Sequence, residues 1–359
     1  MRTIRNRLRS VLLLTGLAIG AAAQSPHSAP LRLPPTRASA PVKIGKEDYF
    51  PISAVERRWG LRGTWLKRDE KLLLQNERWK IEFDADSREV EINGLRLFLG
   101  EPCRVIKRML YISKADADLI LGPILTPGYL QAAVPDLRVI AIDPGHGGSD
   151  HGTQNPRLGL SEKTFTLDVS LRLARLLRAD GYKVIMTRDS DVRLDLPVRS
   201  VTANTYGADL FLSIHFNSLL PDVKPSGSEF YTFPPVGIRS AEAWSAKKDD
   251  DTETTAAPIN KFDHWNSVLA FAMQREVLAQ LKTFDRGKKF KHLGVLRGVN
   301  CPGMLIEAGF LSNEAEGRKI ATPEYRQQIA ESIAKGVRSY AAVLSALRTP
   351  AAAGARSGK

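Results

Sequence analysis

The sequence predicts an α/β protein in which a mostly parallel sheet flanked by helices is preceded by a small α+β domain. From residue 137 onward, short apolar runs alternate with long segments of helical periodicity, as in parallel sheets with crossover helices. Before that point, residues 42–125 contain closely spaced short runs separated by turn residues, which indicates hairpins. A length of 359 residues suffices for two domains, and a 43% hydrophobic, 25% charged composition excludes a wholly disordered or collagen-like chain.

The N-terminus has the pattern of an export signal. Arg2, Arg5, Arg7 and Arg9 precede a short apolar run, and small residues follow at 21–23. The alternative is a membrane anchor, but the run is shorter than the ~20 residues needed to span a bilayer. We therefore expect cleavage of residues 1–23, no transmembrane anchor afterwards, and an exported protein that is periplasmic or associated with the cell wall.

A linker and a small domain follow the signal. Residues 24–41 are rich in Pro, Ser and Ala, which is linker composition. The domain at 42–125 begins with a short helix that ends near Gly60, and Asn93-Gly94 is a strong hairpin signal. Its expected strands are residues 61–67, 72–75, 80–84, 89–92 and 95–99.

The second domain, residues 137–347, carries the alternating elements, and residues 348–359 are predicted to be a disordered tail. Ser161 can cap a helix at its start, and Phe165, Val169 and Leu173 form one apolar stripe along it. The expected strands are residues 139–142, 183–187, 210–214, 228–233, 295–296 and 304–306. The expected helices are residues 162–179, 197–206, 267–281 and 323–347. Residues 234–265 look inserted, either as a lid that begins near Ala241 or as a surface excursion.

Three ionisable side chains come directly after apolar strand runs: His146, His215 and Glu307. Ligands of open α/β sheets bind beyond the carboxyl ends of the strands, so we expect these side chains to lie close together. Each also has a plain interpretation, as a turn histidine, a satisfied core histidine and an ion-paired acid. A glutamate placed after three apolar strand residues is, however, costly to bury without a partner or a function.

These residues favour a catalytic zinc site. Two neutral imidazoles and one carboxylate are ligands that Zn²⁺ accepts, and we assign His146, Glu162 and His215 to the metal. Glu162, in a first helical turn, could instead be a solvated carboxylate. Such a metal polarises a carbonyl and activates water. Glu307 is then placed to take the proton of the water and pass it to a departing amine, acting as general base and then acid.

The remaining charged residues and the two cysteines bear on the binding partners and on the kinds of site that the chain can form. The chain has 52 Lys and Arg against 39 Asp and Glu, and residues 286–291 are the best candidate basic patch. No nucleic-acid-binding motif accompanies this charge, so nucleic acid is not an expected partner. Arg188 and Arg199 either face substrate carboxylates or hold loops by ion pairs. With only Cys103 and Cys301, neither a disulfide framework nor a Cys-rich metal site is expected.

Five motifs, in order, resemble the zinc-dependent N-acetylmuramoyl-L-alanine amidases of the Amidase_3 type. They are Ile142-Asp143-Pro144-Gly145-His146-Gly147-Gly148, Ser161-Glu162-Lys163, Thr187-Arg188, Ser213-Ile214-His215-Phe216-Asn217 and Ile306-Glu307-Ala308-Gly309-Phe310-Leu311-Ser312-Asn313. The resemblance implies zinc bound by His146, Glu162 and His215, a catalytic Glu307, and hydrolysis of the amide between N-acetylmuramic acid and L-alanine in peptidoglycan. Phe216 departs from the family pattern, and its side chain either narrows the cleft or packs in the interior.

The resemblance extends to partners and to the first domain. Some relatives carry an inhibitory helix at the position of residues 234–265. Whether a protein activator is a partner of this chain stays open. Residues 42–125 resemble the stalk domains named after the N-terminal domain of copper amine oxidases, which implies a spacer or targeting role without copper. Two alternatives to the amidase stay open: a peptidoglycan-binding protein without activity, and a zinc amidase for other N-acyl peptides.

Overall fold

The computed structural model describes residues 40–129, 132–241, 244 and 254–349. The predicted export signal, nearly all of the predicted linker and the tail from residue 350 lie outside the described residues. Two sheets dominate the described part, one of four strands and one of eleven. A two-stranded ribbon, β11 (Gln154–Asn155) with β12 (Leu160–Ser161), leads into the helix that carries Glu162.

The small N-terminal part combines the four-stranded sheet, in the order β1-β2-β9-β8, with a hairpin array. Helix α1 (Ile52–Trp59) ends at Gly60, whose φ of 60° is the left-handed conformation that glycine accepts without strain. The strands are β1 (Val42–Ile44), β2 (Glu47–Pro51), β3 (Arg62–Lys67), β4 (Lys71–Gln75), β5 (Lys80–Asp84), β6 (Glu89–Ile92), β7 (Leu95–Phe98), β8 (Arg104–Ile106) and β9 (Met109–Ser113). A helical stretch follows, made of α2 (Lys114–Asp116), η2 (Ala117–Leu121) and α3 (Gly122–Leu125).

The large sheet has the order β13-β10-β14-β17-β15-β16-β7-β6-β5-β4-β3. Its C-terminal strands are β10 (Val139–Pro144), β13 (Lys183–Met186), β14 (Leu210–Asn217), β15 (Ser228–Thr232), β16 (Asp285–Phe290) and β17 (Gly303–Phe310). β13, β10, β14 and β17 run parallel, and β15 turns the direction because it pairs antiparallel with β17. The carboxyl ends of β10, β14 and β17 therefore meet at one edge of the sheet.

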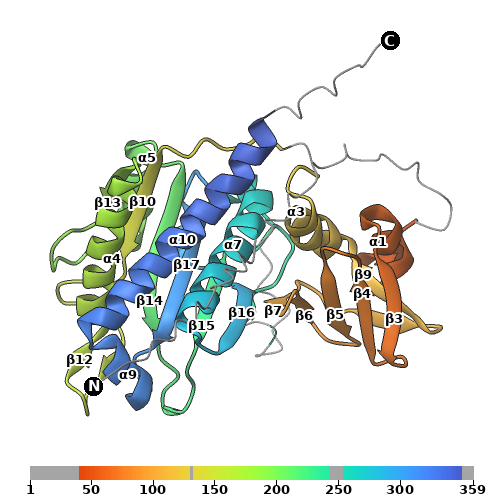
Figure 1. Ribbon diagram of the computed structural model, residues 1–359, viewed down its shortest axis with the longest axis horizontal. Helices are drawn as coiled ribbons and strands as arrows, with labels where there is room; N and C mark the ends of the chain where they lie inside the picture. The colour runs from red at the N-terminus through yellow and green to blue at the C-terminus, as the bar shows by residue number, and fades with distance from the viewer. Residues whose placement is uncertain (1–39, 130–131, 242–243, 245–253, 350–359) are drawn as a thin grey trace, which may run out of the picture. The chain divides into compact units, whose positions relative to one another are not determined.

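Helices cover both faces of the parallel strands. The helices are α4 (Glu162–Ala179), α5 (Leu196–Thr205), η3 (Pro258–Phe262), α7 (Asp263–Leu281), α8 (Gly294–Arg297), α9 (Glu314–Ile320) and α10 (Pro323–Arg348). α4, α7 and α10 lie across one face (Figure 1), and residues such as Val169, Leu269 and Ile333 share a core cluster with the sheet. The predicted stripe of Phe165, Val169 and Leu173 is thus buried, and the predicted α/β class is confirmed.

The two predicted domains share a sheet and a core. β7 pairs in parallel with β16, with Leu97 opposite Lys288. Phe271 of α7 and Phe290 of β16 belong to the same hydrophobic cluster as the N-terminal strands. Gln274 of α7 donates a hydrogen bond from Nε2 to the carbonyl of Arg96 over 2.8 Å. The N-terminal part is therefore packed against the second part rather than joined to it only by a linker.

Some expected elements differ in the structure. The predicted strand at 295–296 is wrong, because these residues lie in helix α8; a short apolar pair fits a helix as well as a strand. Strand β16 is not predicted from the sequence because it is highly charged. The predicted basic patch at 286–291 falls largely on this strand, where Lys288 is only 1% exposed and Arg286 and Lys289 pair with Glu229. These residues do not form one exposed patch.

Within the ranges given above, none of the helices is both long and apolar enough to cross a bilayer.

Candidate active site

His146 lies in a tight loop after β10. Its φ is 61°, and its Nδ1 lies 3.0 Å from Oδ2 of Asp150. A carboxylate at Nδ1 favours the tautomer with the proton there, which leaves Nε2 available as a ligand. The loop glycines permit close approach, because a Cβ on Gly145 would lie 2.3 Å from the His215 ring and one on Gly152 would lie 2.6 Å from Oε2 of Glu162.

Glu162 is the first residue of α4, and the preceding loop positions it. Its backbone N–H donates to the carbonyl of Thr153 over 2.9 Å, and its Oε2 accepts from the backbone N–H of Thr153 over 2.7 Å. The expected cap by Ser161 differs in detail: the residue is at the N-cap position, but its hydroxyl donates to the carbonyl of His151. Loop carbonyls, not the serine side chain, therefore satisfy the helix start.

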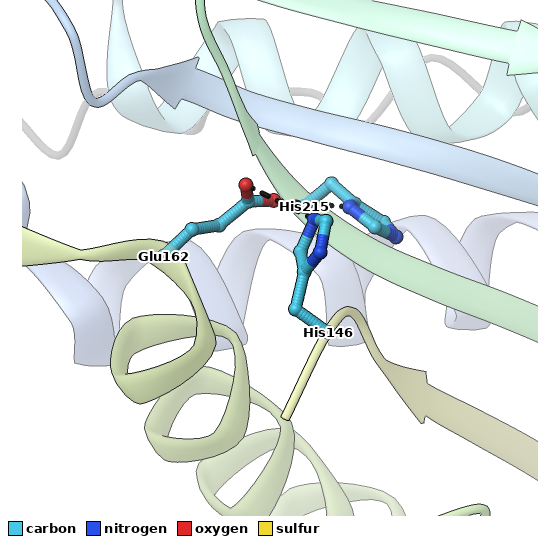
Figure 2. Close-up of side chains that lie close together, drawn as sticks. All are labelled: His146, Glu162 and His215. Atoms are coloured by element: carbon cyan, nitrogen blue, oxygen red, sulfur yellow. Dashed lines mark hydrogen bonds and ion pairs between the residues drawn. The ribbon is translucent and has the colours of Figure 1, made fainter. Parts of the chain in front are cut away.

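The structure brings His146, Glu162 and His215 together (Figure 2). Nε2 of His146 lies 3.1 Å from Oε2 of Glu162, and Nδ1 of His215 lies 3.0 Å from Oε1. One ligand atom from each residue lies within 4.8 Å of the others. The three side chains come from a loop, a helix start and strand β14, so segments distant in sequence meet at the predicted edge of the sheet.

The cluster is electrostatically coupled. Burial alone would raise the pKa of the Glu162 carboxyl, but hydrogen bonds and charges from the two histidines outweigh burial and lower this pKa well below its usual range. Burial alone would lower the pKa of His146, yet its bonds to Glu162 and Asp150 raise it. Glu162 therefore stays ionised, as a metal-binding carboxylate must be.

Glu307 lies on β17, directly opposite His215 of β14 and Glu229 of β15. Its Oε2 is buried and has no hydrogen-bond partner among the described residues. Burial, followed by the charges of Glu162 and Glu229, raises the pKa of Glu307 well above its ordinary value. A buried carboxyl oxygen without a hydrogen-bond partner is costly, which makes Glu307 a candidate functional residue beside the cluster.

Arg188 and Arg199 hold the loop that carries His146. Nη1 of Arg199 lies 2.9 Å from Oδ1 of Asp143, and Nη2 donates to the carbonyl of His146 over 2.9 Å. Arg188 donates to the carbonyls of Pro144 and Gly145. Both arginines are only 3% exposed. The predicted loop-holding ion pair is confirmed for Arg199, whereas Arg188 holds the loop by hydrogen bonds to carbonyls.

The donor set fits zinc. Two imidazole nitrogens and one carboxylate oxygen are a ligand combination of catalytic zinc sites, which leave one further position open. Asp150 supplies the outer hydrogen bond that orients such a histidine. His146 and His215 also line a cleft, which gives a substrate access to the cluster.

Sequence reasoning missed two acids at this site. Asp150 follows His146 by four residues in an irregular loop, where no periodicity reveals a contact. Glu229 had a weaker signal than Glu307, since it is a charged residue within the expected strand at 228–233 but does not follow an apolar run. Glu229 is 3% exposed and accepts hydrogen bonds from Arg286, Lys289 and Tyr231.

Other side chains near the motifs have structural roles. Phe216 is buried and packs edge-on against Phe165, so it does not narrow the cleft. Trp244 lies just after Ala241, where the expected lid begins. Its Nε1 donates to the carbonyl of Gly100 over 2.9 Å, and its ring packs against Arg88. Residues 242–243 and 245–253 of that segment lie outside the described residues.

The fold and the cluster together define an α/β protein with a candidate metal centre at the carboxyl edge of its parallel strands. Residues 140–339 match the Amidase_3 family, described as N-acetylmuramoyl-L-alanine amidase. The match covers more than half of the chain, and it includes all four site residues. The chain belongs to this family.

Individual relatives support the same family. The chain is 34% identical over 200 residues to the sporulation-specific N-acetylmuramoyl-L-alanine amidase of Bacillus subtilis (strain 168), covering 55% of this chain and 66% of that protein. It is 31% identical over 220 residues to the N-acetylmuramoyl-L-alanine amidase AmiC of Escherichia coli O6:H1, covering 56% and 52%. The chain thus spans about half to two thirds of the length of these relatives.

Among solved structures, the N-acetylmuramoyl-L-alanine amidase from Clostridium difficile 630 has a TM-score of 0.49 and 30% identity, covering 57% of this chain and 97% of that one.

Proposed function

We propose that this protein is a zinc-dependent hydrolase that cleaves the amide between N-acetylmuramic acid and L-alanine in peptidoglycan. The observation that carries the proposal is the convergence of His146, Glu162 and His215, with ligand atoms within 4.8 Å, beside the buried Glu307. Family membership supports the substrate class. Remodelling of the wall or separation of daughter cells is the proposed process.

The proposed roles divide between binding and proton transfer. His146, Glu162 and His215 would hold zinc, which would supply Lewis acidity toward the scissile carbonyl and toward water. Asp150 orients His146, and Arg199 fixes the loop on which His146 lies. Glu162 lies within hydrogen-bonding distance of both imidazoles, so the three side chains proposed to hold zinc are already close together.

Glu307 moves the proton. The oxygen of water forms a bond to the carbonyl carbon while Glu307 takes one of the water's protons. The C–N bond then breaks as the protonated Glu307 gives this proton to the leaving nitrogen. The products are the lactyl carboxylic acid on the glycan and the free amine of L-alanine. A raised pKa suits this step, because the carboxyl must hold the proton before passing it on.

Product analysis tests the proposed function. Incubation of the protein with purified peptidoglycan and zinc should generate new L-alanine N-termini and lactyl-terminated glycan, separated by chromatography. A protein that binds the wall but generates neither product would be the non-catalytic binder. Cleavage of small N-acyl peptides with intact wall left unchanged would instead identify an amidase of different substrate range.

We also propose that the protein is exported, on the basis of residues 1–23, and acts in the periplasm or at the cell wall. The shared sheet between β7 and β16 supports a structural role for residues 42–125 over a separately moving stalk.

A further inference from the structure

A cleft of about 230 Å³ opens beside His146 and His215. One of its walls is apolar, made of Leu196 at the start of α5 and of Leu293 and Val295 at α8. Leu196 is 53% exposed, and covering its apolar surface with a ligand would be favourable in free energy. The cleft therefore offers an apolar surface directly next to the proposed metal ligands.

The charged side chains that line the cleft differ in whether they have partners within the protein. Asp143 and Arg199 form a buried ion pair, and Asp150 accepts from Gly152 and lies against His146. The exposed Asp195, at the N-cap of α5, is the other acid of the lining, and its side chain does not cap the helix. Arg193 is exposed, and among the described residues its guanidinium has one hydrogen bond, a long one of 3.4 Å to Oγ of Ser149. Arg193 thus presents a positive charge to the cleft with no acidic partner in the described part of the chain.

The position of Arg193 is fixed relative to the histidine loop. A Cβ on Gly148 would lie 2.6 Å from the backbone nitrogen of Arg193, so the two backbones are in direct contact. Asp191, two residues earlier, accepts from the backbone N–H of Gly148 over 2.7 Å and from Nζ of Lys163 over 2.8 Å. The base of the Arg193 side chain is therefore anchored to the same loop that carries His146.

We propose that this cleft takes the peptide arm of the substrate and that Arg193 binds a carboxylate of that peptide, which makes it a specificity-determining residue. This inference rests on the proposed function. The two arms of the substrate differ in charge: the stem peptide carries carboxylates, whereas the sugar arm offers neutral hydroxyl and N-acetyl groups. A guanidinium fork matches a carboxylate in two parallel hydrogen bonds, and the apolar wall suits aliphatic peptide side chains.

Two substrates that differ in one group test the inference. Both are muramoyl-dipeptides, one with a free α-carboxylate on the second residue and one with that carboxylate amidated. The parent should show the lower KM for the carboxylate form. Arg193→Gln should raise KM for that form about tenfold, leave KM for the amide nearly unchanged, and leave kcat within about twofold. Arg193→Lys, which keeps the charge but loses the fork, should recover part of the preference.

Arg175→Gln is the matched control. Arg175 is an exposed arginine about 20 Å along α4 from Glu162, so its loss changes the net charge equally without touching the cleft. Equal effects of Arg193→Gln on both substrates, or the same effect from Arg175→Gln, would overturn the inference. If the parent cleaves neither substrate nor peptidoglycan, the proposed function itself fails and the assignment of Arg193 fails with it.

Discussion

Replacing Glu307 with glutamine should reduce hydrolysis by about 10²- to 10⁴-fold while the protein stays folded and keeps its zinc. Glutamine has nearly the same shape, but it can neither take a proton from water nor deliver one to the leaving amine. Its uncharged amide also removes the repulsion with Glu162 and Glu229, which adds to burial in raising the pKa of Glu307. The rate of hydrolysis of peptidoglycan fragments and the zinc content are measured on the same preparation. Together they distinguish loss of proton transfer from loss of the metal.

Glu314→Gln is the control for this variant, because Glu314 is an exposed carboxylate in the first turn of α9 and should have no effect on turnover. Hydrolysis by Glu307→Gln at the parent rate would remove Glu307 from the mechanism. Loss of zinc together with activity would show that the residue holds the metal centre rather than transferring protons.

Breaking the buried ion pair beneath the histidine loop should lower the free energy of unfolding by about 3–5 kcal/mol. Asp143 is fully buried and accepts hydrogen bonds from Arg199, Thr187 and Ser213, and Arg199 is 3% exposed. Arg199→Met leaves the carboxylate of Asp143 without its cation. Because Arg199 also holds the carbonyl of His146, zinc affinity should fall as well. Urea unfolding and a zinc titration measure the two quantities.

The double variant Asp143→Asn with Arg199→Met provides the control. Removing both charges leaves no uncompensated ion, so its loss of stability should be smaller than the sum of the two single losses. Single variants within about 1 kcal/mol of the parent, or a double variant as unstable as that sum, would show that the pair does not stabilise the loop.

The convergence of the candidate metal ligands could be predicted largely from local patterns. Apolar runs that end in His146, His215 and Glu307 identify strands whose carboxyl ends share an edge, whatever the rest of the chain does. Glu162 is predictable for the same reason, as the start of a strongly periodic helix. Their roles in binding and catalysis remain predictions, which the experiments here address.

Features that depend on contacts between distant segments could not be predicted. β16 has a charged sequence, and its place in the sheet results from β7 and β15 on either side and from the pairing of Arg286 and Lys289 with Glu229. The two predicted domains join into one sheet at the same strand, where β16 pairs with β7. Tertiary packing here outweighs the weak strand preference of polar residues.

Zinc content, compared between the parent and Glu162→Ala, is the most direct test of the metal centre. The variant removes the carboxylate that lies between both imidazoles, whereas Glu324→Ala removes an exposed carboxylate from the first turn of α10 and serves as its match. We expect one zinc ion per chain in the parent and in Glu324→Ala, and none in Glu162→Ala. Stoichiometric zinc in Glu162→Ala, or full hydrolysis by parent protein stripped of metal, would contradict the account.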